Sequence, residues 1–203
     1  MIVQVLLAAG LSSRMGRSKP LLDFGGEPLL ARMVAMASRS RVDEILVVLG
    51  HEADRIRETI DLRSVTVVVN ERYERGQTTS LQAAVAALPA AARAFVNLPV
   101  DYPLVTERDI DLLIEAYETR PPGGATVFTA AHQGKRGRPT LFDRTHFPEI
   151  LALGPDEPTR SLLSKHASAV REIEVDNPSI LTDMDTPDDY QRLLRQHGAT
   201  EGT

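Results

Sequence analysis

Glycine and basic residues share one short loop near the start of the chain, a combination that suits the binding of phosphate groups. The apolar run Ile2 to Leu7 has the length and composition of a buried strand, and it leads directly into residues 8–20, AAGLSSRMGRSKP. Small residues let the backbone approach an anion, exposed N–H groups point at it, and Arg14 and Lys19 can neutralise its charge. The alternative is an ordinary strand-to-loop turn with incidental surface charge.

Two familiar phosphate-binding motifs do not match this loop. A P-loop has four residues between its glycines and then Lys followed by Ser or Thr, whereas five residues separate Gly10 from Gly16, and Arg17 follows. The dinucleotide fingerprint G-x-G-x-x-G is also absent, so a dehydrogenase is a weak interpretation. The order of residues in the loop therefore has to decide its function.

Carboxylates follow two further stretches of the chain. Asp101 comes just after the strand-like run 95–98, where open α/β sheets hold their ligands, although aspartate close to proline also commonly starts a turn. Asp183 and Asp185 are two residues apart and would share one face of an extended chain. The stretch 186–189, TPDD, fits a helix N-terminus, which accounts for its own two aspartates by capping and helix-dipole effects.

Strand-like runs that alternate with amphipathic stretches have to position these residues. We expect strands at 2–7, 44–49, 65–69, 95–98, 125–130 and 138–142, and an antiparallel edge strand at 170–175. Helices are expected at 29–38, 53–60, 83–88, 106–117, 147–153 and 160–166, and from 186 onward. The alternation predicts an α/β fold: one domain over 1–198 with three α/β/α layers and a mostly parallel, Rossmann-like sheet, then a flexible tail over 199–203.

Composition is that of an ordinary globular protein, with 42% apolar and 25% charged residues in a chain of 203. The net charge of −5 argues against a nucleic-acid partner, which would require a basic stripe. Without cysteine there is no disulfide and no thiolate chemistry. No run reaches membrane-spanning length and no signal peptide is evident, so we expect a cytoplasmic protein. The five histidines show no metal-like spacing and are expected to be surface or packing residues.

The order of residues in the first loop resembles the signature L-A-A/G-G-x-x-x-R-M-G-x-x-K of the Rossmann-like nucleotidyltransferases, in the MobA-like NTP transferase family. Further matches follow in family order over nearly the whole chain: residues 76–81 fit G-x-x-x-S-L, residues 101–104 fit Asp-x-Pro-Leu, and residues 183–189 fit Asp-x-Asp-Thr-Pro-Asp-Asp. The pair Ala9-Gly10 matches the cytidylyl branch, that of the molybdenum cofactor cytidylyltransferases, whereas the guanylyl branch usually has Gly-Gly.

This resemblance implies a nucleotidyltransferase that uses CTP and Mg²⁺, with molybdopterin as the phosphorylated acceptor, pyrophosphate as the second product and a molybdoenzyme as client. It implies catalytic roles for Arg14, Lys19 and Asp101, and Mg²⁺ binding by Asp101 and Asp185. Arg138 stands where the cytidylyltransferases commonly have histidine, and we expect it to contact the acceptor. The expected nucleotide-binding residues are Leu7, Ala8, Ala9, Gly10, Arg14, Lys19, Asn70, Gly76 and Ser80.

Two alternatives stay open. The same chemistry could serve another phosphorylated acceptor, such as a sugar phosphate or a polyol phosphate, because Arg138 departs from the family pattern. The chain could also be a non-catalytic accessory protein that binds a nucleotide or cofactor. The joint presence of Lys19, Asp101 and Asp185 favours an enzyme, because a pure binding protein has less need for all three.

Overall fold

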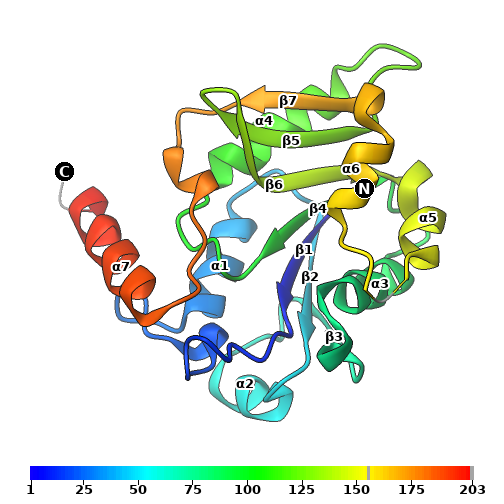
Figure 1. Cartoon of the computed structure of the whole chain (residues 1–203). Coiled ribbons are helices and arrows are strands. Elements are labelled where there is room, and N and C mark those ends of the chain that lie inside the picture. Colours follow the sequence, from blue (N-terminus) through cyan, green and yellow to red (C-terminus); the bar gives the residue numbers. More distant parts are fainter. Residues whose placement is uncertain (155, 202–203) are drawn as a thin grey trace.

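The protein is built around one seven-stranded sheet with helices on both faces (Figure 1). A computed structural model describes residues 1–154 and 156–201. The strands, in chain order, are β1 (Ile2–Ala8), β2 (Glu44–Leu49), β3 (Thr66–Val69), β4 (Ala94–Pro99), β5 (Val127–His132), β6 (Lys135–Asp143) and β7 (Val170–Glu174). Their order across the sheet is β3-β2-β1-β4-β6-β5-β7.

The direction of the strands follows from the connections between them. β1 is parallel to β2 and β4, and β2 is parallel to β3. β6 runs antiparallel to both of its neighbours, β4 and β5, because a two-residue turn at Gln133 and Gly134, both with positive φ, joins β5 directly to β6. The strand at the edge was predicted to be antiparallel, and this was wrong. β7 occupies the edge and runs parallel to β5, because the chain leaves the end of β6 beside Val127 and, after α5 and α6, returns at that same edge of the sheet, where Val170 pairs with Val127.

Helices cover the two faces of the sheet and bury two separate apolar clusters, as a three-layer fold requires. α1 (Leu29–Ser38), α4 (Glu107–Glu118) and α7 (Pro187–Glu201) pack with the first cluster, and α2 (Ala53–Thr59) contributes Ile56 to it. α3 (Gln77–Ala87), α5 (Phe147–Ala152) and α6 (Arg160–Lys165) pack with the second. Side chains of β1 point alternately to the two faces of the sheet, so that Leu6 lies in the first cluster and Val5 in the second.

The last helix extends past the end that the sequence predicted for the domain. α7 continues through Glu201, whereas the predicted tail began at 199. Residues 202–203 of that tail lie outside the described residues. Among the helices that the structure describes, none has both the length and the apolar character needed to cross a membrane.

Two backbone contacts bring the C-terminal acidic stretch to the ends of the central strands. The turn Pro178–Leu181 crosses β6 so closely that a Cβ at Gly137 would collide with the carbonyl oxygen of Ile180. The amide of Met184 then donates to the carbonyl oxygen of Asp101 at 2.8 Å. As a result, residues that are far apart in the sequence meet where β1 and β4 end.

Candidate active site

A pocket of about 300 Å³ opens where the parallel strands β1 and β4 end. This is the edge at which open α/β sheets bind ligands. Its walls come from the first loop, from the start of α3 and from the turn after β4. The lining residues are Leu7, Ala8, Ala9, Gly10, Leu11, Ser12, Lys19, Pro20, Tyr73, Glu74, Gly76, Gln77, Ser80, Pro99, Val100 and Asp101.

The first loop is held in shape by Ser12. Its carbonyl oxygen accepts from the amides of Met15 at 2.9 Å and Gly16 at 3.1 Å, and its Oγ accepts from the amide of Lys19 at 3.2 Å. Met15 is buried and anchors the turn in the first apolar cluster. The loop is therefore folded back on itself. Lys19 begins a short 3₁₀ turn, and the side chain of Lys19 lines the pocket.

Two cations hold one carboxylate at the edge of this pocket. The Lys19 Nζ lies 2.8 Å from Asp185 Oδ1, and the Arg14 Nη2 lies 2.8 Å from Asp185 Oδ2. The Lys19 side chain is only 11% exposed, whereas that of Arg14 is 71% exposed. Lys19 is thus a fixed member of the pocket wall, while Arg14 reaches Asp185 from the solvent side and is not among the lining residues.

Asp101 is half-buried between the pocket and the C-terminal stretch. Burial raises the pKa of its carboxyl above the ordinary value, the positive charge of Lys19 opposes that rise, and Asp185 and Asp183 add to it. Its Oδ1 is buried and has no hydrogen-bond partner within the described part of the chain. A buried carboxylate oxygen without a protein partner, close to a second carboxylate, is a donor set that fits a hard divalent cation such as Mg²⁺ or Mn²⁺.

The start of α3 forms the opposite wall. Gly76 precedes the helix with φ 105, a conformation that side chains disfavour, and both it and Ser80 line the pocket. Asn70 lies behind this wall rather than in it: the residue is buried, and its Nδ2 donates to Ser80 Oγ at 3.0 Å and to Thr79 Oγ1 at 2.9 Å. The contact that Asn70 offers the pocket is therefore indirect, through the position of Ser80.

Arg138 lies beside the pocket, on the side of Asp101. It stands in β6, is half-buried, and its Nη1 donates to Thr140 Oγ1 at 3.3 Å. Burial raises the pKa of the nearby Tyr102, the charge of Asp101 adds to that rise, and Arg138 opposes it. Arg138 and Tyr102 thus form a polar pair next to the carboxylates, although neither lines the pocket itself.

Sequence reasoning missed several of the lining residues. Ser12, Tyr73 and Gln77 have side chains that could bind a ligand directly. Ser12 and Gln77 lie within stretches that the sequence analysis had singled out, residues 8–20 and 76–81, and Tyr73 lies three residues before the second of these. Their position in or near these motifs was the available signal. What the sequence could not supply is which neighbouring side chains turn inward, because that depends on how the turns around Ser12 and Gly76 are closed.

Comparison with known proteins gives matches over nearly the whole chain. The model of the MobA-like NTP transferase domain matches residues 4–170. The molybdenum cofactor cytidylyltransferase of Escherichia coli (strain K12) is 29% identical over 189 residues, with 92% of each chain covered. The purine catabolism protein PucB of Bacillus subtilis (strain 168) is also 29% identical, over 204 residues and 96% of each chain.

A solved structure of similar sequence has the same fold. Rv0371c from Mycobacterium tuberculosis H37Rv is 32% identical and gives a TM-score of 0.85, with 96% of this chain and 97% of that chain covered. A second structure of Rv0371c, in complex with manganese, gives 29% identity and a TM-score of 0.81, with 96% and 98% covered. A divalent metal is thus present in the structure of a relative.

Proposed function

The chain belongs to the MobA-like NTP transferase family, and on that premise we propose that it is a CTP:molybdopterin cytidylyltransferase that forms molybdopterin cytosine dinucleotide and pyrophosphate. Family membership makes it a nucleotidyltransferase, acting on a nucleoside triphosphate and a phosphorylated acceptor. The choice of CTP and molybdopterin is supported by the cytidylyltransferase relative and by Ala9 in the pocket wall. A molybdoenzyme would then be the client that receives the product.

The observation that carries the proposal is the meeting of three charged groups at one pocket. Lys19 reaches both the pocket and Asp185, and Asp101 presents a buried carboxylate oxygen without a protein partner. A structural ion pair needs no cavity beside it and no second, unsatisfied carboxylate. Nucleotidyl transfer needs a cavity for its substrates and a carboxylate that would hold a divalent cation, because that cation, with Lys19, would neutralise the negative charge on the transferred group.

The reaction does not require the protein to form a covalent bond with either substrate. An oxygen of the acceptor phosphate attacks the α-phosphorus of the triphosphate, and a new P–O bond forms. The bond from the α-phosphorus to its bridging oxygen breaks, and the electron pair leaves with pyrophosphate. Because a phosphate is already an adequate nucleophile, the protein contributes mainly position and charge neutralisation. We assign to Arg14, Lys19 and the amides of the first loop the task of binding the triphosphate and the departing pyrophosphate.

Asp101 and Asp185 are proposed as the ligands of the divalent cation. The cation, when bound, would neutralise phosphate charge and orient the reacting oxygens. Lys19 and Arg14 would keep the Asp185 carboxylate in place until substrate binds, and each is already oriented to donate to an oxygen atom at about 2.8 Å. The Lys19 and Arg14 side chains can therefore exchange the Asp185 carboxylate for phosphate oxygens with little movement of the loop.

The two substrates would occupy different sides of the pocket. Gly76 and Ser80, together with Ala9 and Gly10, are assigned to the nucleoside, and Asn70 to holding Ser80 in position. Arg138, beside Tyr102, is assigned to a phosphate or carboxylate of the acceptor. A sugar phosphate or polyol phosphate is the second candidate acceptor, because Arg138 departs from the pattern of the cytidylyltransferases.

A thermal-shift titration with CTP, GTP, ATP and UTP, each with and without Mg²⁺, tests the nucleotide. A ligand that binds only the folded protein raises the unfolding temperature by mass action. Selective stabilisation by CTP that increases with Mg²⁺ is the expected result. A preference for GTP would change the branch, and no response to any nucleotide would overturn the proposed pocket.

Pyrophosphate release tests the reaction. We expect release from CTP when molybdopterin is present and none when it is replaced by a sugar phosphate or a polyol phosphate. Release with one of these replacements and not with molybdopterin would identify the second candidate. Nucleotide binding without release in any mixture would instead indicate an accessory protein.

A further inference from the structure

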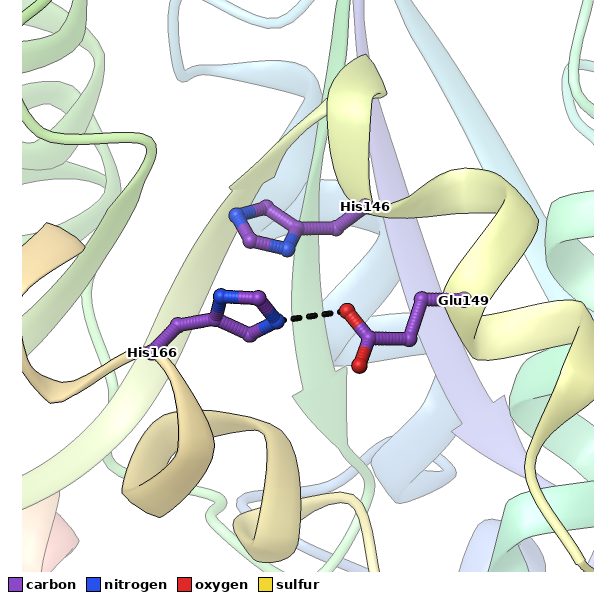
Figure 2. A group of neighbouring side chains, drawn as sticks. All are labelled: His146, Glu149 and His166. Atoms are coloured by element: carbon purple, nitrogen blue, oxygen red, sulfur yellow. Dashed lines mark hydrogen bonds and ion pairs between the residues drawn. The ribbon is translucent and has the colours of Figure 1, made fainter.

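Two histidines and a glutamate gather at the opposite end of the sheet from the pocket. His146 ends the short 3₁₀ turn after β6, Glu149 lies in α5, and His166 follows α6. A donor atom of each lies within 4.8 Å of a donor atom of the other two (Figure 2). β6 ends beside Ala94, the first residue of β4, whereas the pocket lies at the last residue of β4. The cluster is therefore separate from the proposed active site.

From the sequence, the histidines are expected to be surface or packing residues, because their spacing along the chain is not metal-like. The members of the cluster come from three different elements, so their spacing in the sequence gives no metal-like pattern. The Nε2 of His166 and the Oε2 of Glu149 lie 2.5 Å apart. The rings of His146 and His166 have centroids 4.9 Å apart and planes inclined at 72°, so the two rings meet edge to face and not as a stack.

His146 is held in the orientation that a metal ligand requires. It is buried, and its Nε2 shares a hydrogen bond of 2.8 Å with Thr126 Oγ1. That contact leaves the other ring nitrogen, Nδ1, facing Glu149 and His166, as Figure 2 shows. Histidines that bind metals are commonly fixed in this way, with the second nitrogen bonded to a neighbouring group that sets the tautomer and the ring orientation.

We propose that His146, Glu149 and His166 bind a divalent transition metal, with Zn²⁺ as the preferred ion. Two imidazole nitrogens and one carboxylate oxygen are ligands that Zn²⁺ accepts readily, whereas Mg²⁺ prefers oxygen atoms alone. Three protein ligands leave a fourth tetrahedral position for water. The site is distinct from the Asp101 and Asp185 pair, and it does not depend on the proposed transferase activity.

Metal binding requires only small movements. Ligand atoms around a tetrahedral Zn²⁺ are about 3.3–3.6 Å apart, given metal–ligand distances of about 2.0–2.2 Å. The His166–Glu149 contact would open slightly and the contacts to His146 would close. Glu149 and His166 have side chains that are 25% and 31% exposed, so they have room to move toward the fixed ring of His146. Lys165 pairs with the other carboxylate oxygen of Glu149, and at 68% exposure it can turn away.

A metal at this position would join the end of β6 to α5 and α6. These helices cover the second apolar cluster. α3 already holds the chain around them: Gln82 Nε2 donates to the carbonyl oxygens of Ile150 in α5 and of Leu153 just after it, and Thr78 Oγ1 donates to that of Glu157, which lies between α5 and α6. A metal that binds only the folded arrangement stabilises it by mass action. The expected role is structural.

Equilibrium dialysis of the chelator-treated protein against Zn²⁺, in excess Mg²⁺, tests the site. Excess Mg²⁺ occupies sites built from oxygen ligands and leaves a nitrogen-containing site available. We expect the full chain to retain one Zn²⁺ and to unfold at a higher temperature with Zn²⁺ than without it. Glu149→Gln and His166→Ala should each weaken Zn²⁺ binding by more than about tenfold, since even residues that only support a metal ligand are worth about 10–100-fold.

Lys165→Gln is the matched control. It removes the ion pair with Glu149 and keeps all three ligands, so Zn²⁺ binding should be retained or strengthened. Failure of the unaltered protein to retain Zn²⁺ would overturn the proposal, as would equal retention by Glu149→Gln and His166→Ala. Equal loss in Lys165→Gln would also overturn it, because the variants would then act through packing. A cooperative thermal unfolding transition and an unchanged far-UV circular dichroism spectrum, recorded on the same variants without metal, confirm that each is folded.

Discussion

Lys19 and Asp185 are 166 positions apart in the chain, and their Nζ and Oδ1 atoms lie 2.8 Å apart. The contact joins the first loop to the segment that precedes α7, the two ends of the sequence resemblance. It stands next to Asp101, whose pKa is raised by burial and held back by Lys19. The charge on Lys19 therefore acts on two carboxylates at once, and its removal should affect both.

Lys19→Ala should lower nucleotidyl transfer by about 10²-fold or more, the loss typical of removing one group that stabilises transition-state charge. The nucleotide-induced thermal shift should fall as well, because Lys19 lines the pocket. Arg17→Ala is the matched control: it removes an exposed cation from the same loop and should change transfer little. Steady-state pyrophosphate release measures both variants, and an equal loss in the two would contradict a specific role for Lys19.

Asp101→Asn should separate activity from stability. The variant loses the charge proposed to bind the cation, so transfer should fall by about 10²-fold or more. In a metal-free buffer, however, the variant should unfold at a higher temperature than the unaltered protein at neutral pH. The reason is that burial disfavours the ionised carboxylate, and the amide has no charge to bury. Mg²⁺ should then stabilise the unaltered protein more than the variant.

The difference in unfolding temperature between Asp101→Asn and the unaltered protein should depend on pH, because the pKa of Asp101 is raised in the folded state. Because the folded-state pKa of Asp101 is raised above 3.8, its contribution to stability is fully present below 3.8 and is lost as pH rises through the raised value. The difference in unfolding temperature between Asp101→Asn and the unaltered protein should therefore be small near pH 3.8 and grow toward neutral pH. A difference that stays constant across this range would refute the buried-charge explanation.

The elements with continuous apolar runs could be predicted from the sequence, and those with polar starts could not. The run at 2–7 matches β1 (Ile2–Ala8) almost residue for residue. The helix expected at 83–88 begins six residues earlier, at Gln77, because its first turn is polar and Gly76 precedes it in a conformation that the sequence does not reveal. β6 likewise begins at Lys135 and not at 138, since its exposed start depends on pairing with β5.

Motif order identified groups that meet at the pocket, but it could not give their contacts. Lys19 and Asp101 line the pocket, and Asp185 reaches it through Lys19. Nothing in the sequence indicates that Arg14 pairs with the same carboxylate, or that Asn70 lies behind Ser80. These relationships depend on how loops from distant parts of the chain pack against each other. The cluster of His146, Glu149 and His166 depends on packing in the same way.

Arg138→Ala should change the use of the acceptor and leave the nucleotide unaffected. Arg138 lies beside Tyr102 and outside the pocket lining, so the KM for CTP should stay within about twofold, while the KM for the acceptor rises about tenfold, as the loss of one charge-assisted hydrogen bond predicts. Arg138→His, which restores the family residue, should recover part of the loss. A rise in the KM for CTP alone would place Arg138 at the nucleotide and contradict its assignment to the acceptor.

Thr186→Ala should destabilise the protein and also impair its proposed site. Thr186 and Asp189 cap α7 reciprocally: the Thr186 amide donates to Asp189 Oδ2 at 3.0 Å, and the Asp189 amide donates to Thr186 Oγ1 at 3.2 Å. The amide of Asp185 donates to the same Asp189 oxygen at 3.3 Å, so this cap also fixes Asp185. The Thr186 hydroxyl also donates to Asp189 Oδ2 at 2.7 Å, so its loss loosens the carboxylate that holds Asp185. The variant should lose about 1 kcal/mol of unfolding free energy and bind nucleotide more weakly with Mg²⁺.

Thr106→Ala provides the comparison, because Thr106 and Asp109 form the same reciprocal cap at the start of α4. Neither residue lines the pocket or contacts Asp185 through an amide, within the described contacts. Urea unfolding should show similar losses for the two variants, since the two caps are alike. Nucleotide titration should separate them: only Thr186→Ala should bind CTP more weakly with Mg²⁺. Equal weakening in both variants would mean that general destabilisation, and not the position of Asp185, controls binding.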